Sequence, residues 1–362
     1  MSFSIRPRRF SRRRIFSVVA AAASAVLLLV GPLQAGQAAA HPSLDPSQFH
    51  GVNWADPRDN FASDPVVPSG LSTTDTPKQT YQKAHSILVG FQQNLGANTV
   101  RLPVNPYSVG PNSTWWADYS QAIKAATDLG YNVLLAYWEG PGTLDDGIVD
   151  DPTTWWSMWD TLTTTYAHNP HVYFEPMNEP HGYTAADWVG LVSQWLDTYP
   201  AIPRDRVFVD GNGYADHLSD VCSAPSLDGT YLALHDYGFW ATHSYSDWLS
   251  DFSTRIAGCQ DRAVLDEFGA PMTTGYDYSA LPSASTGGQS NSVAFMQAAT
   301  DTVRKLRMGS VYWPGLRNGD SYSMETLTGS AAKPTLANTN ESGRALLEWG
   351  WGRGTVAPHP AE

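Results

Sequence analysis

Residues 171–180 read HVYFEPMNEP, and this stretch decides the fold because it joins a buried strand directly to a carboxylate. A short and almost continuous apolar run such as Val172–Met177 is typical of a parallel strand that is covered on both faces. Pro180 cannot continue the strand, so the chain turns there. We therefore expect Glu179 to project at the carboxyl end of this strand.

The same kind of run recurs along the chain and alternates with helical patterns. The eight expected strands are Phe49–Trp54, Asn98–Leu102, Asn132–Tyr137, Val172–Met177, Val207–Asp210, Tyr231–His235, Ala263–Glu267 and Ser310–Trp313. Helical periodicity covers Gln79–Leu95, Asp118–Leu129, Thr184–Thr198 and Val293–Leu306. Eight strand–helix units over about 300 residues predict an α/β fold, a closed (β/α)8 barrel in one domain. A doubly wound open sheet is the alternative, but no glycine-rich phosphate loop follows the first strand.

A second carboxylate ends a second strand, since residues 263–269 read AVLDEFG. By this count Glu179 ends the fourth strand and Glu267 ends the seventh, and these positions face each other across the mouth of an eight-stranded barrel. Two carboxyl groups about 5–5.5 Å apart can cleave a glycosidic bond, one as nucleophile and the other as proton donor.

The motifs at 178–180 and 266–269 resemble those of glycoside hydrolase family 5, the old cellulase family A. The resemblance covers nearly the whole chain after residue 40. It implies a retaining β-glycosidase without cofactor or metal, with Glu179 as acid/base and Glu267 as nucleophile. For that mechanism Glu179 should begin protonated and Glu267 ionised.

Five further positions match the family one by one. Arg101 resembles the arginine that keeps the nucleophile ionised, and Asn178 the amide that binds the sugar 2-hydroxyl. In the His-x-Tyr motif, His235 is expected to bind substrate or orient the glutamates, and Tyr237 to hydrogen-bond the nucleophile. Trp313 resembles the tryptophan that forms the floor under the reacting sugar.

The end of the third strand departs from the family pattern. Many members carry a histidine there, whereas this chain continues Tyr137-Trp138-Glu139. We expect Trp138 to contact substrate, while Glu139 is open between a substrate contact and a salt bridge. At the end of strand one, Asn53 and Trp54 are also expected at the substrate site. Trp240 is a further sugar platform, because aromatic rings stack on sugar faces.

The first forty residues predict an export signal. A basic head with SRRRIF at 11–16 is followed by an apolar stretch at 17–33 and three alanines at 38–40. This layout is typical of a secretory signal and suits the twin-arginine route. We expect a signal peptide at 1–40, a catalytic domain at 41–362 and a secreted product. An uncleaved membrane anchor is the alternative.

Removal of that segment would leave 16 basic and 35 acidic residues, a net charge of −19. Such a surface repels nucleic acid and anionic membranes and disfavours acidic polysaccharides. The expected partner is therefore a neutral carbohydrate substrate, and a monomer is the default. The two cysteines, Cys222 and Cys259, predict a disulfide in an exported protein, with two buried thiols as the alternative.

Two other classes of function compete with a β-glycosidase. A non-catalytic carbohydrate-binding barrel would be expected to have lost one of the two carboxylates, and this chain keeps both. A metal-dependent barrel hydrolase needs clustered histidines at strand ends, whereas strand one offers only His50. The sugar, the linkage and the choice between exo and endo action are not fixed by the sequence.

Overall fold

The computed structural model describes residues 44–140, 146–281, 288–355 and 357–359. Its main sheet has eight parallel strands in the spatial order β4-β3-β2-β1-β8-β7-β6-β5. These are β1 (His50–Trp54), β2 (Thr99–Val104), β3 (Asn132–Tyr137), β4 (Val172–Glu175), β5 (Phe208–Asp210), β6 (Tyr231–Tyr237), β7 (Ala263–Gly269) and β8 (Gly309–Leu316). All eight expected strands and the (β/α)8 barrel are confirmed.

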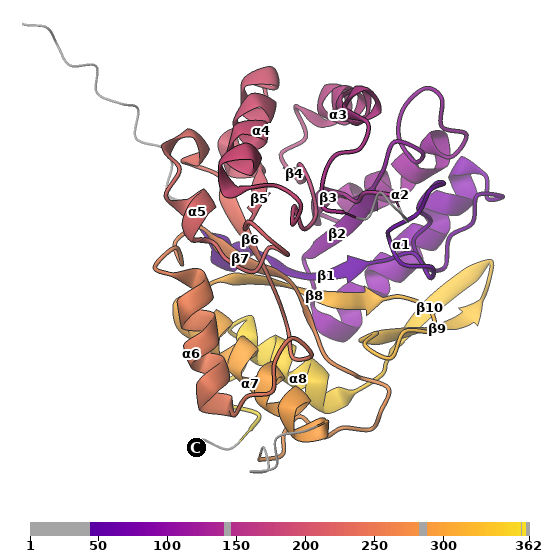
Figure 1. Cartoon of the computed structure of the whole chain (residues 1–362). Coiled ribbons are helices and arrows are strands. Elements are labelled where there is room, and N and C mark those ends of the chain that lie inside the picture. The colour runs from indigo at the N-terminus through magenta and orange to yellow at the C-terminus, as the bar shows by residue number, and fades with distance from the viewer. Residues whose placement is uncertain (1–43, 141–145, 282–287, 356, 360–362) are drawn as a thin grey trace, which may run out of the picture. The chain divides into compact units, whose positions relative to one another are not determined.

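Two strand contacts complete the ring: the pairing of β1 with β8 and a bridge between β4 and β5. The first strand pairs in parallel with the last, and in Figure 1 the indigo β1 lies beside the orange β8. Between β4 and β5, the part of the chain that the structure describes has one isolated parallel bridge, from Phe174 to Val207. The seam between β4 and β5 is therefore the weakest joint of the barrel.

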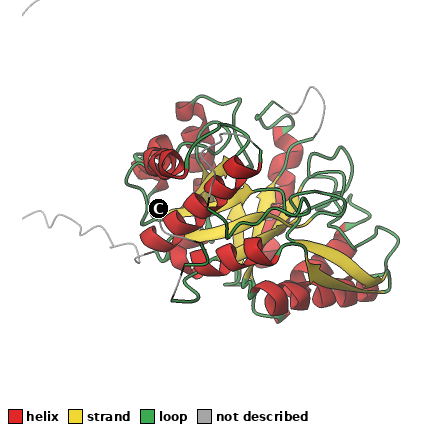
Figure 2. Cartoon of the chain, turned by 90° about the horizontal axis from the view of Figure 1, so that it is seen from below, coloured by secondary structure: helices red, strands yellow, loops and turns green. Residues whose placement is uncertain are grey.

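Helices surround the strands (Figure 2). They are α1 (Pro77–Leu95), α2 (Trp116–Asp128), α3 (Pro152–Tyr166), α4 (Ala185–Thr198), α5 (Ser219–Cys222), α6 (Tyr245–Ile256), α7 (Gln289–Leu306) and α8 (Glu341–Gly350), with 3-10 turns at Pro46–Gln48, Arg204–Arg206 and Pro225–Leu227. The four expected helices are confirmed. An antiparallel hairpin, β9 (Glu325–Ser330) and β10 (Lys333–Asn338), was not expected; it follows β8.

Local chemistry sets the ends of α1. Thr76 and Gln79 form a reciprocal capping box, and Pro77 occupies the first turn, where its missing N–H costs nothing. At the other end Gly96 adopts a left-handed conformation with φ of 68° and caps the helix. The chain then enters β2 within three residues.

The closed end of the barrel is filled by aromatic side chains. Phe49 makes edge-to-face contacts with Tyr173, Phe208 and Tyr231, at centroid distances of 4.9–5.1 Å. Each such pair contributes about 0.5–1.5 kcal/mol beyond the burial of its area. The barrel is therefore packed at the amino ends of its strands, and a site has room only at their carboxyl ends.

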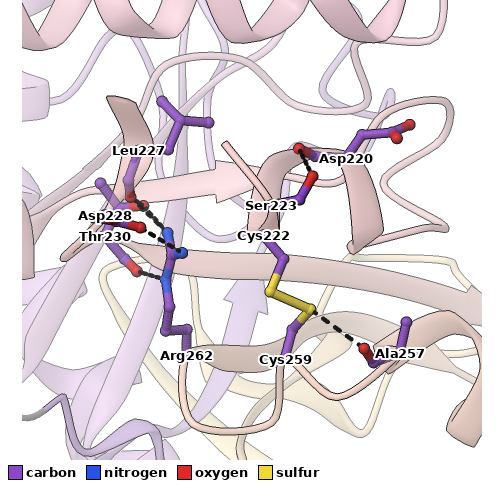
Figure 3. The surroundings of a disulfide bond; sticks show 9 residues. All are labelled: Asp220, Cys222, Ser223, Leu227, Asp228, Thr230, Ala257, Cys259 and Arg262. Carbon is purple, nitrogen blue, oxygen red and sulfur yellow. Dashed lines mark hydrogen bonds and ion pairs between the residues drawn. A yellow bond between two sulfur atoms is a disulfide. The ribbon is translucent and has the colours of Figure 1, made fainter. Parts of the chain in front are cut away.

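The expected disulfide is confirmed. Cys222 at the end of α5 is bonded to Cys259, which lies between α6 and β7, with their Cα atoms 6.1 Å apart (Figure 3). The nearby Arg262 donates to the carbonyl oxygens of Leu227 and Thr230, so it ties down the same two crossover segments.

The expected signal segment, 1–40, lies outside the described residues. Within the described ranges, none of the helices combines the length and apolarity that a bilayer span requires.

Candidate active site

Both glutamates lie at the carboxyl ends of their strands. Glu179 follows β4, and Glu267 lies in β7, two residues before its end. One carboxylate oxygen of each lies within 4.8 Å of the other. Gly269, two residues after Glu267, is required by close packing rather than by a turn. A Cβ at this position would lie 2.0 Å from the Trp313 carbonyl oxygen.

Arg101 on β2 is the centre of the buried hydrogen-bond network. Its Nη1 donates to Oε2 of Glu267 at 2.7 Å, and its Nη2 donates to Oδ1 of Asn178 at 2.7 Å. Its Nε and Nη2 also form a bidentate ion pair with Glu175. A guanidinium is suited to this task because its five N–H donors have a fixed planar geometry. Arg101 thus joins β2 to β4 and β7 beneath the pocket.

Glu267 accepts a hydrogen bond at each oxygen, the second one from the Tyr237 hydroxyl at 2.7 Å. Burial nevertheless raises the pKa of Glu267 to about 7, against the opposing effects of His235 and Arg101. The expected starting form of Glu267 is the ionised one, and burial opposes that form. The physical reason is desolvation, which penalises a carboxylate that is 5% exposed more than its two cationic neighbours stabilise it.

Glu179 is held at its main chain and at its side chain. Its φ of 50° is in the left-handed region, which costs a non-glycine residue about 1–3 kcal/mol. Its N–H donates to Oδ2 of Asp210 at 2.8 Å. Its Oε1 lies 2.9 Å from Nδ1 of His235, and the side chain is 16% exposed. The carboxyl group therefore has one fixed oxygen and one side open to the pocket.

A cavity of about 480 Å³ opens above the two glutamates. Aromatic and charged side chains line it together: Asp59, Phe61, Trp138, Glu179, Tyr214, Tyr237, Phe239, Trp240, Glu267, Trp313, Arg317, Asp320, Ser321 and Tyr322. Trp138 and Trp313 stack with centroids 5.3 Å apart, and Phe61 packs against the edge of this pair. The volume suits a small ligand, and aromatic faces with a few polar groups are the lining that sugars require.

The structure corrects the expectations for Trp54 and Asn53 and places Glu139, which was left open, away from the cavity. Trp54 is fully buried and directed away from the cavity, where its indole packs near Phe91 and donates to the Ser69 carbonyl. Asn53 is also buried, and its amide bonds Arg101 and the Asp266 carbonyl instead of lining the cavity. Glu139 accepts the Gly147 N–H at 2.9 Å, a loop contact, and does not line the cavity.

Other expected residues lie beneath the cavity. His235 is fully buried, so it can orient Glu179 but does not reach the surface of the cavity. Asn178 is 3% exposed, and its Nδ2 has no hydrogen-bond partner among the described residues. That amide hydrogen is therefore available to a ligand hydroxyl. Trp138, Trp240 and Trp313 line the cavity, as expected.

Several cavity residues were missed by the sequence argument. Arg317 donates from Nη1 to Asp320 at 2.9 Å and lies 3.1 Å from Asp59, so it bridges the loops that follow β8 and β1. Tyr214 and Phe239 are half exposed or more at the rim and stack on His181 and Tyr237. All of them follow the carboxyl ends of strands, and that position was the only signal that the sequence offered.

Two groups of donors are close enough to be considered as metal ligands. They are Glu175, Asp210, His235 and Asp266, and Glu179, His235 and Glu267, with donor atoms within 4.8 Å of one another. Arg101 forms an ion pair with Glu175 and lies 3.9 Å from Asp266, so its fixed positive charge disfavours a second cation there. Protons on some of these carboxyl groups balance their negative charge without a metal ion.

A parallel eight-stranded barrel with two carboxylates facing each other over an aromatic floor defines the class of barrel glycoside hydrolases. The chain belongs to glycosyl hydrolase family 5, the cellulase family, whose model matches residues 61–313. The recognition of this family from its strand-end motifs is confirmed.

Individual relatives are distant. Endoglucanase 1 of Saitozyma flava is 25% identical in an alignment of 214 residues that covers 49% of this chain and 62% of that protein. The match thus spans less than two thirds of the relative. The catalytic domain of the major endoglucanase from Xanthomonas campestris pv. campestris superposes with a TM-score of 0.60 at 16% identity, covering 84% of this chain and 94% of that one. A hyperthermophilic endocellulase from Pyrococcus horikoshii gives a TM-score of 0.60 at 16% identity, with 84% and 92% covered.

Proposed function

We propose that this protein is a secreted, retaining β-glycosidase that hydrolyses β-linked neutral glycans or glycosides, with Glu267 as nucleophile and Glu179 as acid/base. The observation that carries the proposal is the separation of the two carboxylates, whose nearest oxygens are no more than 4.8 Å apart. This upper limit lies near the separation of about 5–5.5 Å in retaining enzymes and well below the separation of about 6.5–9.5 Å with which inverting enzymes admit a water.

The reaction follows from the contacts of each carboxylate. Ionised Glu267 attacks the anomeric carbon and forms a glycosyl ester, while Glu179 gives its proton to the departing oxygen. Glu179, now a carboxylate, takes a proton from the incoming water, which breaks the ester and releases the sugar. Arg101 and Tyr237 hold the two oxygens of Glu267 and so fix the direction of its attack.

The lining of the cavity supports a neutral sugar as the substrate. Arg317 forms ion pairs with both Asp59 and Asp320, and all three present hydrogen-bonding groups, while Trp313 offers an apolar face. The structure of one neighbour, the Pyrococcus horikoshii endocellulase, contains cellotetraose. It superposes on this chain with a TM-score of 0.61. A β-linked oligosaccharide is therefore the first substrate to test.

Product stereochemistry is the decisive experiment. Aryl β-glycosides and β-glucan, β-mannan and β-galactan oligosaccharides are incubated with the protein, and proton NMR follows the first anomer released. The β-anomer should appear first. An initial α-anomer would rule out double displacement. If no substrate of this panel is cleaved but sugar still binds, the non-catalytic binding barrel becomes the better reading.

Removal of either carboxylate should separate the two roles. Glu267→Ala should lose turnover by more than about a thousand-fold and keep sugar binding, because no other group can form the ester. Glu179→Ala should lose about 10²–10⁴-fold on substrates whose leaving group needs a proton. Hydrolysis by Glu267→Ala at close to the parental rate would show that the nucleophile is another residue.

A further inference from the structure

Asp210, the last residue of β5, makes a contact that the proposed mechanism does not yet use. It is fully buried, and its Oδ2 accepts the main-chain N–H of Glu179 at 2.8 Å. Its other oxygen, Oδ1, has no hydrogen-bond partner among the described side chains and main chain. The contact crosses the seam between β4 and β5, where the described residues form one isolated parallel bridge, from Phe174 to Val207.

The peptide that Asp210 binds is in an unfavourable conformation. Glu179 has a φ of 50°, and it lies between Asn178 and Pro180, so no glycine relieves the turn. A residue in this region keeps its conformation only where surrounding contacts enforce it. The hydrogen bond that the Glu179 N–H donates to Asp210 is such a contact, and it helps to determine where the carboxyl group of Glu179 points.

The side chain of Glu179 is held from the same buried group of residues. Nδ1 of His235 lies 2.9 Å from Oε1 of Glu179, while Nε2 of His235 lies 3.5 Å from Asp266 and 3.9 Å from Asp210. Asp210, His235 and Asp266 are all fully buried. Main chain and side chain of the proton donor thus depend on one cluster.

We infer that Asp210 is a positioning residue that holds Glu179 in the geometry needed to protonate the leaving group. The inference rests on the proposed role of Glu179. Burial and the nearby Glu175 raise the pKa of Asp210 well above its usual range, so a neutral replacement at this position fits its surroundings. An asparagine has the same shape and keeps the carbonyl acceptor, so it should replace Asp210, whereas an alanine should not.

Leaving groups of different acidity isolate this role. A dinitrophenolate departs without a proton, whereas phenolate and sugar leaving groups depend on general acid catalysis. A positioning residue for the proton donor should therefore matter only for the second kind. A residue that merely stabilises the barrel should affect both kinds equally.

The experiment measures kcat/KM for dinitrophenyl and phenyl β-glycosides of the sugar that the parent protein cleaves. Asp210→Ala should lose at least about thirtyfold on the phenyl glycoside and less than about threefold on the dinitrophenyl glycoside. Asp210→Asn should stay within about threefold of the parent on both. Asp210→Ser has a side chain too short to reach the Glu179 N–H and should behave like the alanine variant. It replaces Asp210→Ala in the experiment if the alanine variant does not fold.

Two further variants make the outcome specific. Glu325→Gln changes another fully buried carboxyl group, whose pKa burial raises to about 7, in β9 away from the catalytic pair. It should affect both substrates equally. Glu179→Ala should show the full leaving-group dependence. If Glu179→Ala shows none, the proposed function fails; if it does and Asp210→Ala does not, only the positioning role of Asp210 fails.

Crystal structures and metal analysis give readouts that do not depend on activity. In Asp210→Ala the φ of Glu179 should leave the left-handed region, and in Asp210→Asn it should remain there. An unchanged φ in the alanine variant contradicts the inference. A stoichiometric divalent ion that elemental analysis finds in the purified parent but not in Asp210→Ala would also overturn it, because Asp210 would then be a metal ligand.

Discussion

At the scale of single residues, the site contains more buried carboxyl groups than positively charged side chains. Glu175, Asp210, Asp266 and Glu267 are buried with Arg101 as the fixed positive charge. Burial lowers the pKa of His235, but the surrounding Glu267, Asp266 and Glu179 outweigh this and raise it well above its usual value. Protons retained on some of these groups complete the balance of charge, and so the site is expected to respond to pH.

The pH dependence of kcat/KM follows from Glu267. Its folded-state pKa of about 7 lies above the ordinary value of 4.5, and in the proposed mechanism the ionised form attacks. Activity should therefore rise with pH through about 7. Tyr237→Phe removes a hydrogen bond to the ionised form, so the acidic limb should move to higher pH by up to about one unit. A parental limb near pH 4.5 would contradict this assignment.

The rule that side chains at strand ends carry the chemistry pointed to Glu179 and Glu267 from the sequence. The resemblance to family 5 added Arg101 and Tyr237, which both hydrogen-bond Glu267, and His235, which lies against Glu179. Neither argument found Asp210, because a buried aspartate in a short strand gives no motif that distinguishes it from a structural ion pair.

At the scale of helices, strands and loops, segments with a clear hydrophobic period could be predicted from the sequence. The polar hairpin of β9 and β10 could not. β9 and β10 have largely exposed, polar side chains, so the alternation that predicts a strand is weak there. Trp54 shows another limit of the pattern. It ends β1, yet its side chain packs outward near the helical layer at Phe91, because successive side chains of a strand point to opposite faces.

The disulfide belongs to this scale, because it joins two crossover segments. Its cysteines are 37 residues apart in sequence, a loop for which the entropy of closure corresponds to about 4 kcal/mol. Cys222→Ser with Cys259→Ser should lower the free energy of unfolding by up to that amount, as measured by urea denaturation. Parent protein treated with reductant should give the same value. Since neither cysteine lines the cavity, kcat should change little.

At the scale of the whole molecule, the 16 basic and 35 acidic residues after position 40 disfavour an anionic substrate, as the proposed function requires. The basic residues that precede position 41 are confined to the expected signal. The sequence was sufficient for the barrel because eight repeated units leave few alternative topologies.

Export should leave a defined amino terminus. When the full chain is expressed in a host with a twin-arginine pathway, intact-mass spectrometry of the culture medium should give a polypeptide that begins at His41. Arg12→Lys with Arg13→Lys should retain the protein inside the cell if this route is used. A secreted polypeptide that still carries residues 1–40 would contradict the expected cleavage.

The single bridge between β4 and β5 has a consequence for local opening of the barrel. Segments with few cross-strand hydrogen bonds open at lower free energy than the global unfolding transition. In deuterium-exchange mass spectrometry, peptides that contain Phe174 and Val207 should therefore take up label before those from β1 and β2, which are paired on both sides. A bound inhibitor that spans the mouth should slow this uptake, because it would bind the two sides of the seam together.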